Sequence, residues 1–152
     1  FSPSGRRVGF VSGRPGNQDL HVLDLDGGRS RLTWLSAFRM QVCGWLDEDH
    51  VLVAAMHNEA LRALSWLYTV SLEGELERLP WGPASAADRN PDGRAVLASP
   101  NFRGPEQWKR YRGGMVNRVW VSDVRQENWT RLLPRETASL AGPCWVGERI
   151  VV

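Results

Sequence analysis

Cysteine is scarce in this 152-residue sequence, which contains only Cys43 and Cys144. Two cysteines are too few for a disulfide scaffold, so we expect two buried free thiols and a reducing, cytoplasmic setting. The sequence also lacks any apolar run near the roughly 20 residues that a membrane-spanning helix needs. A strong excess of one charge is missing as well, because 19 basic residues face 17 acidic residues, whereas nucleic-acid-binding domains are usually far more basic. We therefore expect no membrane partner and no nucleic-acid partner.

Motifs for catalysis and for metal binding are missing too. There is no Gly-x-Ser-x-Gly elbow, no His-Glu-x-x-His, no Cys-x-x-Cys pair and no glycine-rich phosphate loop before a helix. The histidines His21, His50 and His57 fall in an expected strand, turn and loop, where a lone histidine is more often structural than a base or ligand. The acidic turn Asp47–Asp49 fits no calcium-binding loop and is expected to be solvated. The sequence thus predicts no catalytic residue, no metal site and no cofactor in this chain.

Glycine and proline, by contrast, are abundant. The 15 glycines and 9 prolines argue against long helices and favour short strands joined by turns. With 42% hydrophobic and 24% charged residues, the composition is that of a globular domain. At roughly 100–200 residues per domain, the length corresponds to one domain or to a piece of a larger one. Because the sequence starts at Phe1 and stops within the expected strand Ile150–Val152, we expect a fragment.

The clearest positive pattern is an internal repeat of about 44 residues. Four turn segments, each leading into an apolar strand, mark its copies: Phe1–Arg6, Trp45–His50, Arg89–Arg94 and Trp145–Arg149. The first three segments start 44 residues apart, and the third copy is longer by about 12 residues. The second half of each copy holds an alternating strand that ends in a polar turn, which is typical of a β-hairpin. Four short strands in about 44 residues is the period of a β-propeller blade.

This period predicts an all-β fold, an incomplete β-propeller of about three four-stranded blades. The expected organisation is a partial blade at 1–35 without its innermost strand, complete blades at 36–82 and 83–135, and the first half of another blade at 136–152. The eight tryptophans suit the packing of one blade on the next, since each ring buries a large apolar area. Other blades of a parent chain are expected as partners, because an open ring leaves sheet exposed at both ends.

One stretch conflicts with the repeat. Residues Ala54–Leu67 have strong helix propensity when they are read alone. The repeat instead places the end of one strand, a connecting loop and the start of the next strand there. We follow the repeat, because tertiary context often overrides propensity, and we allow for a short helical turn in the loop.

Two features are candidates for binding. The basic insertion at 101–114 places Trp108 and Tyr111 among cations. Such a loop can stack on bases or hold peptide carboxylates, but packing of the two rings on the blade is the preferred interpretation. Arg39 lies just before an expected innermost strand, where loops line the axial channel of a propeller. Its guanidinium is expected either to face that channel or to pair with a carboxylate at the rim.

A family resemblance rests on the same insertion. The segment Trp108–Gly114 (Trp-Lys-Arg-Tyr-Arg-Gly-Gly), followed by the strand start Arg118–Val121, resembles the N-terminal six-bladed propeller of the tricorn protease family. The turns Ser2–Gly5 and Asn90–Gly93 are similar to blade turns of that family and of TolB-like and prolyl-oligopeptidase propellers. The resemblance spans essentially the whole chain and implies that the closed ring has six blades.

The resemblance also implies a function. Tricorn-like proteins are cytoplasmic serine peptidases that trim oligopeptides, assemble as homo-hexamers, and carry two propellers, a PDZ-like module and catalytic domains. The family's catalytic groups lie downstream and match nothing here. A pair of adjacent basic residues in the family grips the C-terminal carboxylate of the substrate, and the nearest match here, Phe38–Met40, contains only Arg39. Arg39 is therefore the one candidate substrate-binding residue.

Three functions follow as alternatives. The first is a non-catalytic propeller segment of a tricorn-like serine peptidase, which forms a channel wall and guides oligopeptides to or from a downstream active site. The second is a TolB-like, protein-binding propeller without enzyme activity. The third is the gating propeller of a prolyl-oligopeptidase-like enzyme.

Overall fold

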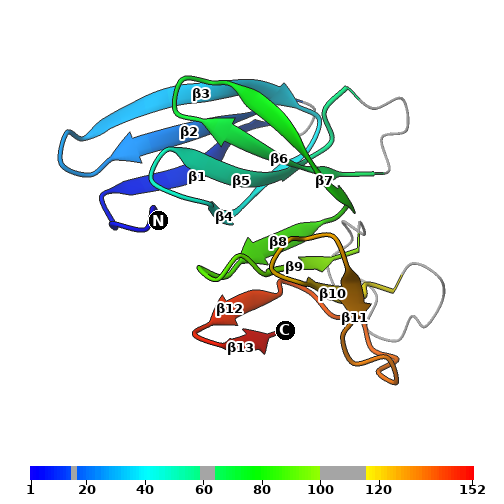
Figure 1. The fold of residues 1–152 in the computed structure, drawn as a ribbon. Coiled ribbons are helices and arrows are strands. Elements are labelled where there is room, and N and C mark those ends of the chain that lie inside the picture. Colours follow the sequence, from blue (N-terminus) through cyan, green and yellow to red (C-terminus); the bar gives the residue numbers. More distant parts are fainter. Residues whose placement is uncertain (15–16, 59–63, 100–115) are drawn as a thin grey trace. The chain divides into compact units, whose positions relative to one another are not determined.

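A computed structural model describes residues 1–14, 17–58, 64–99 and 116–152 of the chain (Figure 1). All the regular secondary structure in these ranges is β-strand, so the predicted all-β fold is confirmed. The chain divides into two compact units, Phe1–Gly82 and Pro83–Val152. The basic insertion at 101–114 lies outside the described residues.

The first unit begins with a three-stranded antiparallel sheet. Its strands, in the order β1-β2-β3, are β1 (Arg7–Arg14), β2 (Asn17–Asp24) and β3 (Arg29–Ala37). The turn from β2 to β3 forms because the Asp24 carboxylate accepts the Asp26 amide at 3.0 Å and the Asp24 carbonyl accepts the Gly28 amide at 2.7 Å. Gly28 adopts a φ of 61°, a left-handed conformation that favours glycine.

A four-stranded antiparallel sheet completes the first unit. Its strands lie in chain order and are β4 (Met40–Trp45), β5 (His50–Ala55), β6 (Trp66–Ser71) and β7 (Leu76–Pro83). Strand β5 is almost wholly buried. This agrees with its continuous apolar run, which is typical of a strand that is covered on both faces. The stretch Ala54–Leu67, which has high helix propensity, therefore supplies the end of β5 and the start of β6. The helical turn that we allowed for would fall at 59–63, outside the described residues.

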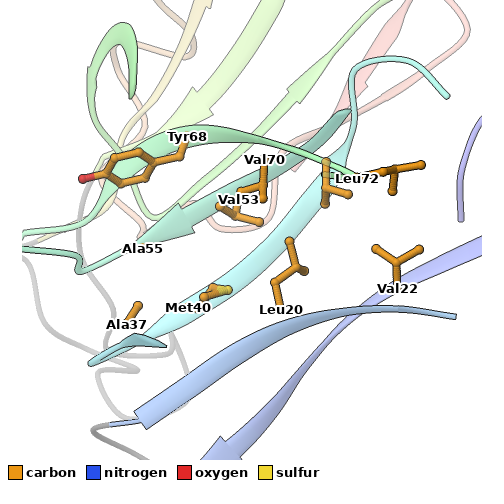
Figure 2. Close-up of a cluster of buried hydrophobic side chains, with 10 residues drawn as sticks. Leu20, Val22, Ala37, Met40, Val53, Ala55, Tyr68, Val70 and Leu72 are labelled. Atoms are coloured by element: carbon orange, nitrogen blue, oxygen red, sulfur yellow. The ribbon is translucent and has the colours of Figure 1, made fainter. Parts of the chain in front are cut away.

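The two sheets of the first unit pack face to face around one apolar cluster (Figure 2). Leu20 and Val22 of β2 contribute from one sheet, and Met40, Val53 and Val70 contribute from the other. Burying a side chain of this size stabilises the fold by about 1.5–3 kcal/mol relative to leaving it exposed. The packing of sheet on sheet is thus the main source of stability in this unit.

The second unit contains another four-stranded antiparallel sheet and a hairpin. The sheet has the order β11-β10-β9-β8 and consists of β8 (Ala86–Arg89), β9 (Ala95–Ala98), β10 (Val119–Ser122) and β11 (Trp129–Arg131). The hairpin pairs β12 (Cys144–Val146) with β13 (Arg149–Val151). The Trp145 amide donates to the Asp88 carboxylate at 2.7 Å, and the Arg94 guanidinium lies 4.9 Å from the Trp145 ring centroid. These two contacts attach the hairpin to the sheet.

The cysteines correct one expectation. Neither Cys43 nor Cys144 forms a disulfide, as predicted, but both side chains are only half-buried. Cys43 lies on β4 and Cys144 on β12, and both strands are at the edge of a sheet. A residue on an edge strand is covered less completely than a residue between two neighbouring strands.

Candidate functional site

Arg39 lies on a sharp bend between β3 and β4. The bend is held on both sides by backbone hydrogen bonds to Met56, since the Phe38 amide donates to the Met56 carbonyl at 3.1 Å and the Met56 amide donates to the Arg39 carbonyl at 2.9 Å. The next amide, that of Met40, donates to Oε1 of Gln18 at 2.6 Å. The backbone around Arg39 is therefore held by β2 and by the residue that follows β5, while the Arg39 side chain is exposed.

Aromatic side chains gather at the same end of this sheet, where β5 ends and β6 begins. The buried ring of Tyr68 meets the His57 ring edge-on, with centroids 6.1 Å apart, and its hydroxyl donates to the His57 carbonyl at 3.4 Å. Nε2 of His57 lies 3.1 Å from Nδ2 of Asn58. One strand farther along, the Arg78 guanidinium stacks 3.4 Å above the Trp66 ring.

Arg39 offers the chemistry of anion binding at this end of the sheet. A guanidinium keeps its charge at every physiological pH and presents a fork of donors that matches a carboxylate. Arg39 is thus suited to hold an anionic group in place. The prediction that Arg39 binds a peptide carboxylate remains a prediction.

The acidic turn Asp47–Asp49 lies at the opposite end of β4. The Asp47 carboxylate accepts the amides of Asp49 and His50, each at 2.8 Å, and lies 2.9 Å from Nδ1 of His50. Partial burial raises the pKa of Asp47, but the hydrogen bonds from the Asp49 amide and the His50 ring outweigh that effect and hold the pKa below its usual value. Asp47 therefore stabilises its own turn as a carboxylate.

The other carboxylates of this turn join the two sheets of the first unit. Oε2 of Glu48 accepts the Ser4 hydroxyl at 2.8 Å, and the Glu48 carbonyl accepts Nη1 of Arg7 at 2.9 Å. The same nitrogen lies 3.6 Å from the Asp49 carboxylate. A pocket of about 390 Å³ opens beside these contacts, and Asp24 and Asp26 of the β2–β3 turn also line it. The turn is solvated, with the Asp47 and Asp49 side chains 58% and 68% exposed, and its carboxylates also make these contacts.

The third histidine, His21, lies on β2. His21 stacks on Phe10 across β1 and β2, with ring centroids 5.4 Å apart, and this places it on a sheet surface far along the chain from His50 and His57. Among residues 1–14, 17–58, 64–99 and 116–152, no three His, Cys, Asp or Glu side chains are grouped so that they could hold a metal ion. The same ranges contain no helix that is long and apolar enough to cross a membrane.

Sequence reasoning missed the contacts that join one repeat to the next. The bond from Ser4 to Glu48 spans 44 positions and the bond from Trp145 to Asp88 spans 57. Serine, glutamate and aspartate are common in turns, so the residue types carried no signal of these pairings. The repeat period is the only hint, because it places Ser4 and Glu48 at equivalent positions of consecutive copies.

Successive antiparallel sheets of up to four strands, each joined by hairpins and, in the first unit, packed face to face, define the chain as part of a β-propeller. The model of the tricorn protease N-terminal β-propeller domain matches residues 1–152. The chain belongs to this family. The predicted resemblance and the predicted incomplete propeller are both confirmed.

Curated relatives agree with the family. A tricorn protease homologue of Streptomyces coelicolor is 38% identical over 99% of the chain, and a second homologue from that organism is 33% identical over 99%. The tricorn protease of Thermoplasma acidophilum is 27% identical over 99%. The chain spans only 13%, 14% and 15% of the lengths of these three proteins.

Solved structures show the same fold. The crystal structure of the tricorn protease superposes with a TM-score of 0.79 at 24% identity, covering 99% of this chain and 15% of that one. TolB from Acinetobacter baumannii superposes with a TM-score of 0.63 at 14% identity, covering 87% of this chain and 31% of that one. A likeness at these identities concerns the architecture alone.

Proposed function

We propose that this chain is a non-catalytic propeller segment of a tricorn-like serine peptidase, in which it forms a channel wall that guides oligopeptides to or from an active site elsewhere in the parent chain. The observation that carries the proposal is the family match over residues 1–152. The parent protein is proposed to act in the cytoplasm as a homo-oligomer, a hexamer by resemblance.

Within this function, Arg39 is proposed to contact the C-terminal carboxylate of the peptide. Its side chain is exposed, and it extends from a bend whose backbone is held by hydrogen bonds with Met56 and Gln18, so the Cα from which the guanidinium reaches is fixed. A charge-assisted hydrogen bond contributes about 1.5–3 kcal/mol, and solvent reduces this at an exposed site. Loss of the contact should therefore weaken peptide binding about tenfold.

The two alternative functions are distinguished by what the parent chain does with peptides. A TolB-like binding propeller would bind a folded protein and cleave nothing, and a prolyl-oligopeptidase-like gate would restrict access to an α/β-hydrolase site. The likeness to TolB rests on 14% identity and concerns architecture, whereas the family match concerns tricorn propellers specifically. The match favours the tricorn-like function.

The test uses the intact parent protein and pairs of short peptides that end in a free carboxylate or in an amide. Arg39→Ala should raise KM about tenfold for the free-carboxylate peptides and leave KM for the amides unchanged. Arg6→Ala is the matched control, because Arg6 is an exposed arginine at the opposite end of the same unit, 3.9 Å from Asp26. Equal effects of Arg39→Ala on both peptide types would remove the role of Arg39. A parent protein that cleaves no peptide would remove the peptidase proposal itself.

A further inference from the structure

Two Asp–Gly pairs occur in the sequence, Asp26–Gly27 in the turn from β2 to β3 and Asp92–Gly93 in the turn from β8 to β9. An aspartate followed by glycine is prone to spontaneous isomerisation, because no Cβ on the glycine hinders its amide nitrogen from reaching the aspartate side chain. The two pairs have nearly the same chemistry in an unfolded chain. A difference in their reactivity is therefore decided by the fold.

The turn at Asp26 leaves the reacting groups exposed and weakly held. The Asp26 side chain is 78% exposed, and its carboxylate lies 3.9 Å from Nε of Arg6 in a surface ion pair, a kind of contact that stabilises little. The Gly27 amide donates to Oδ1 of Asp24 at 3.4 Å, which is longer than the roughly 2.7–3.2 Å of an ordinary N–H···O hydrogen bond. Neither the carboxylate nor the amide nitrogen is thus firmly held away from the other.

The turn at Asp92 holds the same groups firmly. Oδ2 of Asp92 accepts Nε of Arg94 at 2.7 Å and lies 2.6 Å from Nη2, and Oδ1 accepts the Arg94 amide at 2.9 Å. The hydrogen bond from the guanidinium, and then that from the amide, holds the pKa of Asp92 below its usual value, so the protonated carboxyl that can lose its hydroxyl is rarer. The Gly93 amide donates to the Asn90 carbonyl at 2.9 Å.

Packing also restricts the main chain at Gly93. A Cβ at Gly93 would lie 3.0 Å from the Val124 carbonyl oxygen, and the Gly93 carbonyl accepts Nε2 of Gln126. At Gly27 the nearest atom that a Cβ would meet beyond the chain neighbours is Cγ of Asp24, 3.9 Å away. Ring closure between the side chain and the next amide needs rotation of the main chain, which the first turn allows and the second opposes.

We propose that Asp26 is a site of spontaneous conversion to isoaspartate in the folded protein, and that Arg94 and the packing around Gly93 protect Asp92 from the same reaction. The Gly27 nitrogen attacks Cγ of the protonated Asp26 carboxyl, the new N–Cγ bond replaces a Cγ–O bond, and the amide proton leaves with the hydroxyl as water. Water then adds to the main-chain carbonyl carbon of Asp26 in this succinimide, and the bond from that carbon to the nitrogen breaks. The chain now runs through Cγ, and the α-carboxylate is free.

The product alters the turn in which it forms. Its main chain is one atom longer between Asp24 and Gly28, so the 2.7 Å hydrogen bond from the Gly28 amide to the Asp24 carbonyl cannot keep its geometry. Asp26 also lines the pocket beside the contact of Ser4 with Glu48. The conversion therefore moves a negative charge next to the link between the two sheets of the first unit.

The first test compares the two sites within one molecule. The intact parent protein is incubated in neutral buffer made with heavy-oxygen water, and its peptides are mapped by mass spectrometry with electron-transfer fragmentation, which distinguishes isoaspartate from aspartate. Isoaspartate that carries one heavy oxygen should form at Asp26 at least about tenfold faster than at Asp92, and the two rates should become similar in urea. No isoaspartate at Asp26, or equal rates in the folded protein, would overturn the proposal.

The second test separates the causes with two substitutions. Gly27→Ala adds a Cβ beside the attacking nitrogen; Gly27 has no left-handed φ and the Cβ has room, so the turn is kept while the rate at Asp26 should fall about tenfold. Arg94→Ala frees the Asp92 carboxylate and should raise the rate there severalfold, with the rate at Asp26 unchanged. An unaltered rate at Asp26 in the first variant, or at Asp92 in the second, would contradict the proposed mechanism.

Discussion

Truncation of Leu20 to alanine should destabilise the protein more than any change of similar size on its surface. The side chain of Leu20 is 0% exposed and lies in the cluster that joins the first two sheets (Figure 2). Leu→Ala at such a site removes three carbon atoms and leaves a cavity, at a cost of about 2–5 kcal/mol. Leu20 contacts side chains of both sheets, and neither sheet can move by itself to fill the cavity. We therefore expect the free energy of unfolding to fall by about 3 kcal/mol. For a chain of this size that corresponds to a fall in Tm of about 6–12 °C.

Urea unfolding of the wild type, Leu20→Ala and Leu25→Ala measures this effect. Leu25 is the matched control, since it follows the same strand but is 48% exposed. Its truncation should change the free energy of unfolding by less than about 0.5 kcal/mol. The midpoint for Leu20→Ala should fall while the m-value stays constant. A loss below about 1 kcal/mol, or equal losses for both variants, would refute the packing of the two sheets as the main source of stability.

The acidic turn gives two further predictions. Glu48→Ala removes both contacts of the side chain with Ser4 and should lower the free energy of unfolding, measured in urea, by about 1 kcal/mol. Glu73→Ala, at an exposed position, is the control. Equal effects of the two substitutions would contradict a link between the sheets. The pKa of Asp47 is lower in the folded than in the unfolded protein, so its contribution is present above the unfolded pKa and is lost as the pH falls through the folded pKa. Asp47→Asn should therefore be less stable than wild type at pH 7, with the difference shrinking below about pH 4; a difference that is independent of pH would contradict the role of its charge.

Much of the local structure could be predicted from the sequence. The alternation in Leu20–Leu25 follows the two-residue period of a strand, and the Asp-Gly-Gly turn after it needs the residue types that it has. The recurrence of such units at 44 positions was sufficient to predict a propeller. In Ala54–Leu67 the repeat was also a better guide than helix propensity, because burial of β5 on both faces decides that conformation.

The candidate site was predictable only in part. The sequence placed Arg39 between two strands, which the structure bears out. It gave no sign that Met56 and Gln18 would hold the backbone of the bend, since these residues lie about 17 and 21 positions away along the chain. The half-buried state of Cys43 was likewise not predictable, because exposure depends on which neighbouring segments cover a strand.

The amino-acid sequence by itself thus determined the strands, their turns and the repeat, because these depend on neighbours within a few positions of the chain. Only the tertiary structure decided which turns meet. The contacts of Ser4 with Glu48 and of Trp145 with Asp88 join polar groups that many other surface residues could have satisfied equally well. Hydrogen bonds of this kind are short-ranged and chemically unspecific, so their partners are selected by the packing of one apolar sheet face on the next and not by the residues themselves.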